Sequence, residues 1–121
     1  MEKRSSKDII WTGSDFAGRN VSLYVQERDH IIKGHELQGM SRNFHAVYNT
    51  VQSPDVVYTS RDSVSREVMY SRNAGADYEP RLMTTVVVEY PQTDRGYIVT
   101  AYPVRKEGNN IGIRVYPESD L

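Results

Sequence analysis

Apolar and polar residues alternate near the start of the chain with the two-residue period of β-strands. Val21, Leu23 and Val25 share one face under this alternation. A shorter apolar run covers residues 9–11, and Gly13 with residues 17–20 supplies turn-forming positions between the two runs. The pattern therefore predicts two short strands, at 9–11 and 21–25.

The period changes to that of a helix in the next segment. Residues 27–37 are rich in helix formers, and Gly39 is a plausible stop. A second helix is expected to begin at a Ser41 cap and to run to about Val51, before Pro54. The positions that recur at helical spacing and should face the core are Phe44, Val47, Tyr48 and Val51.

After Pro54 the pattern is that of strands to the end of the chain. The expected strands are 56–59, 67–70, 82–90, 97–104 and 111–116. If residues 62–65 form a four-residue hairpin loop, Arg61 lies directly across from Arg66, on the same face as Tyr70.

These elements predict an α+β fold with two helices, both in the N-terminal half, packed on a mainly antiparallel β-sheet. A length of 121 residues is most simply one domain, 1–121. We expect residues 1–7 to form a flexible polar lead-in and not a secretory signal, since no hydrophobic run follows them. No apolar stretch approaches the ~18 residues needed to span a bilayer.

Charge and composition narrow the possible chemistry. The net charge of −1 argues against a general nucleic-acid binder, so any contact with RNA must come from a local cluster of Arg and Lys. Because the chain has no cysteine, it offers no disulfide and no thiol nucleophile. Its nine tyrosines can pack a sheet, contact phosphate or stack on a base, and most are expected to pack the sheet.

Two of the three histidines, His30 and His35, lie on the first predicted helix. They are about 140° apart around its axis, which does not suit the i, i+4 pair typical of a metal site. Acidic residues are scattered, with no ladder for Mg²⁺ or Ca²⁺. Each histidine has two interpretations at this point, as a proton-transfer group or as a capping or half-buried structural residue.

Three further residues could contact a phosphate. The forked guanidinium groups of Arg61 and Arg66 suit an anion between them, although both could also extend into solvent. Thr100 shares a strand face with Ile98 and Tyr102, and its hydroxyl is a neutral hydrogen-bond donor. A threonine in a strand also needs no special explanation.

In their order, these segments resemble the nuclease toxin domains of phage and polymorphic toxin systems that adopt the BECR fold, named for barnase, EndoU, colicin and RelE. The resemblance covers about residues 21–104. The matching segments are His30-Ile31 with His35-Glu36, Pro54-Asp55 followed by Arg61, Tyr70, the valines 86–88, and Ile-Val-Thr-Ala-Tyr at 98–102.

The resemblance implies a metal-independent endoribonuclease that needs no cofactor. It implies His35, His30, Arg61 and Thr100 as catalytic residues, and Tyr70, Arg66 and Tyr102 as substrate-binding residues. It also implies RNA as substrate, a cognate immunity or antitoxin protein as a partner, no membrane partner, and a cytoplasmic site of action with delivery by a phage or a secretion system.

Two alternatives remain open from the sequence. The first is a non-catalytic RNA- or protein-binding phage module of the same fold, which the low net charge and the absence of a close histidine pair favour. The second is an immunity or structural protein, although the chain has no acidic run of the kind such a protein would use.

Overall fold

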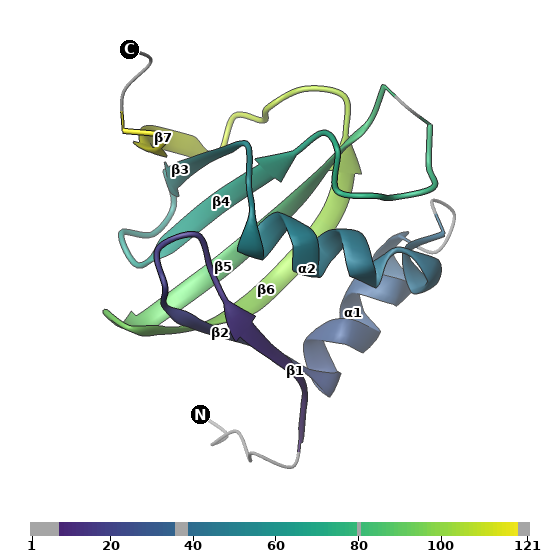
Figure 1. The fold of residues 1–121 in the computed structure, drawn as a ribbon, viewed down its shortest axis with the longest axis horizontal. Helices are drawn as coiled ribbons and strands as arrows, with labels where there is room; N and C mark the ends of the chain where they lie inside the picture. The colour runs from purple at the N-terminus through teal and green to yellow at the C-terminus, as the bar shows by residue number, and fades with distance from the viewer. Residues whose placement is uncertain (1–7, 36–38, 80, 119–121) are drawn as a thin grey trace.

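The computed structural model describes residues 8–35, 39–79 and 81–118. Figure 1 shows a single twisted sheet with two helices against it. The strands are β1 (Ile9–Ser14), β2 (Asn20–Tyr24), β3 (Val56–Ser60), β4 (Arg66–Ser71), β5 (Met83–Gln92), β6 (Arg95–Val104) and β7 (Ile111–Tyr116). The helices are α1 (Val25–His35), a short 3₁₀ turn η3 (Met40–Arg42) and α2 (Phe44–Gln52).

The sheet has the strand order β1-β2-β6-β5-β4-β3-β7. Its neighbours pair antiparallel except β2 and β6, which are parallel. The predicted α+β class, with two helices on a mainly antiparallel sheet, is confirmed. The strand pair expected from residues 82–90 and 97–104 is the centre of this sheet, as β5 and β6.

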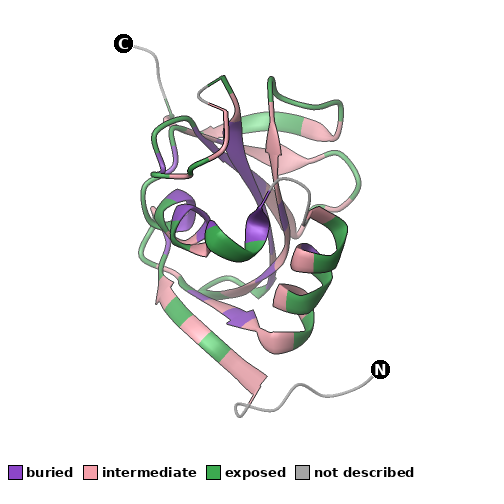
Figure 2. Cartoon of the chain, turned by 90° about the vertical axis from the view of Figure 1, so that its right-hand side faces the viewer, coloured by how far each residue is buried: buried purple, intermediate pink, exposed green. Residues whose placement is uncertain are grey.

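One face of the sheet, here called the helix face, carries the main core. Val57, Met69 and Val86 point to this face and contact Val47 and Val51 of α2 in one buried cluster. Phe44 and Tyr48 of the same helix are half-buried against that cluster. The helical spacing of these four positions therefore predicted the buried side of α2 correctly, and Figure 2 marks parts of α2 and of the central strands as buried.

The opposite side of the sheet, here called the open face, faces away from α2 (Figure 1). It holds a second, smaller buried cluster of Val68, Tyr70, Met83 and Val87. The connection from β6 to β7 touches this face, where Glu107 accepts a hydrogen bond of 2.9 Å from the Tyr58 hydroxyl.

Helix α1 lies along the edge of β6 that β2 leaves unpaired. Only residues 20–22 of β2 pair with β6, through residues 95–97. The chain then turns directly from β2 into α1, which contacts the rest of β6 (Figure 1). Ile31 anchors α1 in the main core. This position carries the C-terminal end of α1 to the rim of the open face.

Several element boundaries differ from the prediction. Strand β1 extends to Ser14, and Val25 begins α1 and does not end a strand. The expected helix end at Leu37 and the lead-in 1–7 lie outside the described residues, as does Glu36 of the helix motif. None of the helices in the described part of the chain is long and apolar enough to cross a membrane.

The predicted Ser41 cap of the second helix is wrong. Gly39 adopts a positive φ of 71°, and Ser41 lies inside the 3₁₀ turn that follows it. Helix α2 begins only after Asn43, whose buried side chain donates to the Gly39 carbonyl and accepts from the Asp77 amide. The Asn43 side chain that fixes the start of α2 thus contacts a residue 34 positions away in the sequence, and capping rules based on neighbouring residues cannot predict such a contact.

The predicted register of the β3–β4 hairpin is also wrong by one residue. Val57 pairs with Met69 and not with Tyr70, and Thr59 pairs with Glu67. The connection spans five residues, 61–65, and the Arg66 amide donates to the Ser63 carbonyl. Since a one-residue shift moves each side chain to the other face, Arg61 does not oppose Arg66.

Candidate active site on the open face

His35 lies at the C-terminal end of α1, with its ring stacked on Tyr102 of β6. The two ring centroids are 5.6 Å apart and the rings are inclined by 30°. An eleven-residue helix rises about 16 Å, which matches the roughly 16 Å of strand between Tyr97 and Tyr102. Helix α1 is therefore long enough to reach from the end of β2, where it begins, to the C-terminal half of β6, where it places His35.

The environment of His35 favours the neutral imidazole. Its pKa is lowered from the ordinary histidine value of 6.5 by partial burial and by the positive charge of His30. A neutral imidazole can accept a proton near pH 7, as a general base must. His30 itself is exposed on α1, and its charge acts on His35 electrostatically.

A row of hydroxyl-bearing residues crosses the open face from Tyr102. Tyr102 pairs with Thr85 of β5, and Thr85 pairs with Tyr70 of β4, so all three point to the same side. The Thr85 hydroxyl is buried and has no hydrogen-bond partner among the described residues. Thr85 was not predicted from the sequence, because a threonine inside an apolar strand has no distinguishing local pattern.

Thr100 lies two residues before Tyr102 on β6, so both side chains point to the same face. It pairs with Val87, whose side chain belongs to the buried cluster of the open face. A register irregularity follows directly, because Val88 pairs with Ile98 and leaves Val99 as an extra residue. Bulges of this kind re-aim the side chains beside them. The structure thus brings Thr100, Tyr102 and His35 to one region.

Tyr70 is part of the buried cluster of the open face, beside Thr85. Only 1% of its surface is exposed, and its hydroxyl oxygen accepts a hydrogen bond of 3.1 Å from the Gly108 amide. Burial raises its pKa above the usual value of 10, so the phenol stays neutral. As a substrate-binding residue, Tyr70 would stack on a base or hydrogen-bond a phosphate. Stacking needs an exposed ring, and the structure does not support that role.

Arg61 does not lie beside Thr100, although the resemblance implies both as catalytic residues. It follows the end of β3, and its Nη1 atom donates to the Asn109 carbonyl at 3.0 Å. Strands β4 and β5 separate β3 from the strand of Thr100. With about 4.8 Å between adjacent strands, the gap is roughly 14 Å. Arg61 instead forms a hydrogen bond with the loop that precedes β7.

Arg66 is on the open face but is already paired. Its Nε atom lies 2.7 Å from the Glu89 carboxylate, which also accepts a hydrogen bond from Ser65. Burial raises the pKa of Glu89, but the hydrogen bonds from Ser65 and Arg66 outweigh it and hold this pKa below its usual value. The guanidinium charge is therefore largely compensated, and the predicted phosphate contact would have to compete with Glu89.

Among the described residues, no group of three or more His, Asp or Glu side chains is placed to hold a metal ion. Comparison of the chain with protein-family models, with curated proteins and with solved structures finds no match. The resemblance to BECR nuclease domains therefore stays a prediction from the sequence.

Proposed function

We propose that this chain is a metal-independent endoribonuclease, acting as a toxin domain, with its active site at the His35 end of the open face. The observation that carries the proposal is the His35–Tyr102 stack, in which the pKa of His35 is lowered. Thr100 lies two residues before Tyr102 on the same face of β6. The proposal matches the expectation for a BECR-type nuclease in its helix histidine and in its strand threonine, but not in Arg61.

In the proposed reaction the ribose 2′-oxygen attacks the adjacent phosphorus while neutral His35 takes the hydroxyl proton. The bond from phosphorus to the 5′-oxygen then breaks, and that oxygen takes a proton from an acid, which leaves a 2′,3′-cyclic phosphate. Thr100 and Tyr102 donate hydrogen bonds to the phosphate oxygens as charge develops on them. This proton comes from either His30 or Tyr102.

The displacement of Arg61 favours a second function, a non-catalytic RNA- or protein-binding module of the same fold. Metal-free cleavage gains from a cation beside the phosphorane, whereas Arg61 contacts a loop carbonyl and Arg66 pairs with Glu89. Expression separates the two functions, since an active ribonuclease should harm the cell that produces it and a binding module should not. An immunity or antitoxin partner remains a proposal that follows from the toxin function.

The direct test is incubation of purified protein with RNA, with and without excess chelator. We expect cleavage at an unchanged rate in chelator, and products that end in a 2′,3′-cyclic phosphate. His35→Ala protein, purified in parallel, controls for contaminating ribonucleases. Loss of cleavage in chelator, or products with 5′-phosphates, would contradict the mechanism.

The pH dependence of the rate tests the role of His30. If His35 is the base, the rate falls as pH drops through its pKa, so the acidic midpoint should lie below the ordinary histidine value of 6.5. His30→Ala removes a positive charge that lowers this pKa. The midpoint should therefore move to higher pH, and a retained plateau rate would leave Tyr102 as the acid. A plateau that falls by roughly 10²-fold or more would instead identify His30 as the acid.

A further inference from the structure

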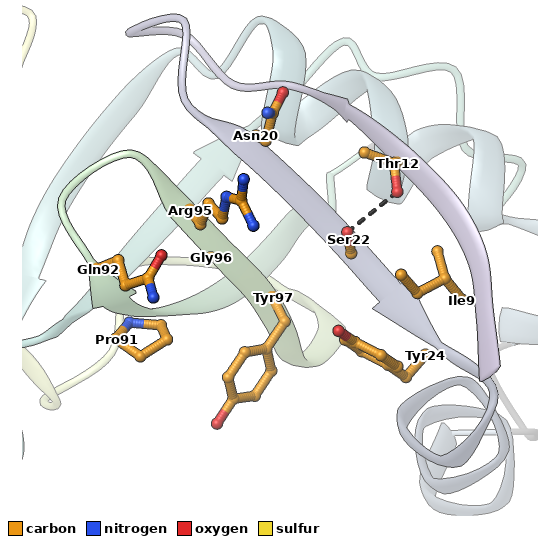
Figure 3. A pocket seen from close by; sticks show the side chains of 10 residues that line it. All are labelled: Ile9, Thr12, Asn20, Ser22, Tyr24, Pro91, Gln92, Arg95, Gly96 and Tyr97. Atoms are coloured by element: carbon orange, nitrogen blue, oxygen red, sulfur yellow. Dashed lines mark hydrogen bonds between the residues drawn. The ribbon is translucent and has the colours of Figure 1, made fainter. Parts of the chain in front are cut away.

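A pocket of about 410 Å³ opens where the tip of the β5–β6 hairpin meets the β1–β2 hairpin (Figure 3). This volume falls in the range of about 300–1,000 Å³ that is usual for small-molecule sites. The pocket lies over the short parallel contact between β2 and β6, where Gly96 lines it and pairs with Val21. Gly96 is required there, because a Cβ atom would lie 2.7 Å from both the Glu89 carbonyl oxygen and the Tyr90 ring.

The lining of the pocket combines a cation, amides and aromatic rings. Arg95, Gln92 and Asn20 are exposed, and Figure 3 shows their side chains around the pocket. The Arg95 guanidinium forms no ion pair with any carboxylate in the described part of the chain, unlike Arg66. Tyr24 and Tyr97 are half-buried and meet edge to face, with 6.3 Å between ring centroids.

The pocket opens on the same face of the sheet as the His35–Tyr102 stack. Thr85 and Glu89 are four residues apart on β5, so their side chains point to the same face. Thr85 pairs with Tyr102 of β6, and Glu89 pairs with Tyr97. The Thr85–Tyr102 and Glu89–Tyr97 pairs are four residues apart along β5, a distance of about 13 Å. A chain molecule lying along β6 over Thr100 could therefore reach both places at once.

We propose that this pocket holds one nucleotide of a single-stranded RNA chain, with Arg95 on a phosphate and Tyr97, Tyr24 and Gln92 around the base. The inference rests on the proposed function, because it names where the RNA is held beyond the bond that is cleaved. It also names the local cation that a chain with a net charge of −1 needs in order to hold RNA.

Each part of the lining corresponds to one part of a nucleotide. A guanidinium fork donates two parallel hydrogen bonds to a phosphate. Aromatic rings stack on bases, and amide side chains can both donate to and accept from a base edge. A base reaches such rings only when it is unstacked, so the RNA must be single-stranded where it enters the pocket.

The test separates binding from cleavage by using a labelled ten-nucleotide RNA with 2′-O-methyl groups, which lacks the attacking hydroxyl. Fluorescence anisotropy measures its affinity for the wild-type chain and for Arg95→Ala. We expect Arg95→Ala to weaken binding by roughly tenfold or more, as for loss of a charge-assisted hydrogen bond. The slope of log affinity against log salt should become shallower by about 0.7, the value for one phosphate on a single strand.

Arg42→Ala is the matched control, because it removes the same charge from an exposed arginine paired with Asp77. It should leave both the affinity and the salt slope unchanged. Gln92→Ala should weaken binding while leaving the salt slope unchanged, since an amide contacts the base and releases no counterion.

Equal affinities for Arg95→Ala and Arg42→Ala would overturn the inference, as would failure of the wild-type chain to bind the RNA. Competition by a free 5′-mononucleotide at the affinity of the ten-mer would identify a small-molecule site and overturn the RNA assignment. Binding that depends on Arg95, without any cleavage of unmodified RNA, would support the pocket and overturn the proposed ribonuclease. The two proposals therefore fail by different measurements.

Discussion

Replacement of His35 by alanine should lower the rate of RNA cleavage by roughly 10²–10⁴-fold, the usual effect of removing a proton-transfer group. The side chain is half-buried at the end of α1 and contacts Tyr102 at the rim of the sheet. Its loss removes one ring contact and leaves the buried anchor of the helix, Ile31, in place. The rate constant should therefore fall with little change in the free energy of unfolding.

His45→Ala is the matched control for this experiment. His45 is an exposed histidine on α2, and its ring Nε2 forms a hydrogen bond with the Gly75 carbonyl on the helix side of the molecule. We expect less than a tenfold change in rate for His45→Ala. If a folded His45→Ala protein loses more activity than His35→Ala, the assignment of the active face to the His35 end of the open face is wrong.

The largest effect on stability is expected for Asp15→Ala. The Asp15 side chain is fully buried and accepts hydrogen bonds from Arg19 and from the Tyr90 hydroxyl, the latter at 2.6 Å. Arg19 also pairs with Glu67 of β4, so this cluster ties the β1–β2 turn to the central sheet. Removing one member of a buried hydrogen-bonded ion pair leaves the others unsatisfied, which costs about 3 kcal/mol.

Urea unfolding can measure this loss through the one tryptophan of the chain. Trp11 of β1 stacks on Tyr48 of α2, with ring centroids 4.4 Å apart, so its fluorescence should report unfolding. The control is Asp29→Ala, which breaks an exposed pair with Arg28 and should change stability by less than about 0.5 kcal/mol. Equal losses in the two variants would show that the Asp15 cluster is not a stabilising tie.

Part of the candidate site could be found from the sequence, because its residues lie on elements with strong local patterns. The helix that carries His35 and the strand that carries Thr100 and Tyr102 were both predicted, and the structure brings these three residues together. Arg61 could not be placed in this way. Its position depends on the order of the strands, which places β3 beside β7 with β4 and β5 between it and the strand of Thr100.

The pocket at Arg95 had no signal in the sequence. Its lining comes from β1, β2, β5 and β6, and it exists only because β2 runs parallel to β6 over three residue pairs. Gly96 lines this pocket and lies too close to Glu89 and Tyr90 of β5 for any side chain, but in the sequence it is an ordinary turn residue of the segment 94–96. Contacts between strands more than 70 residues apart leave no periodicity in either strand.

The sequence by itself determined the α+β class, the central β5–β6 pair and the buried side of α2, since two-residue and 3.6-residue periods arise from backbone geometry within each element. The tertiary structure alone decided which side chains share the open face. That choice depends on register, strand order and the point at which β2 gives way to α1. These are set by packing between distant segments, and a shift of one residue reverses the face of every side chain in a strand.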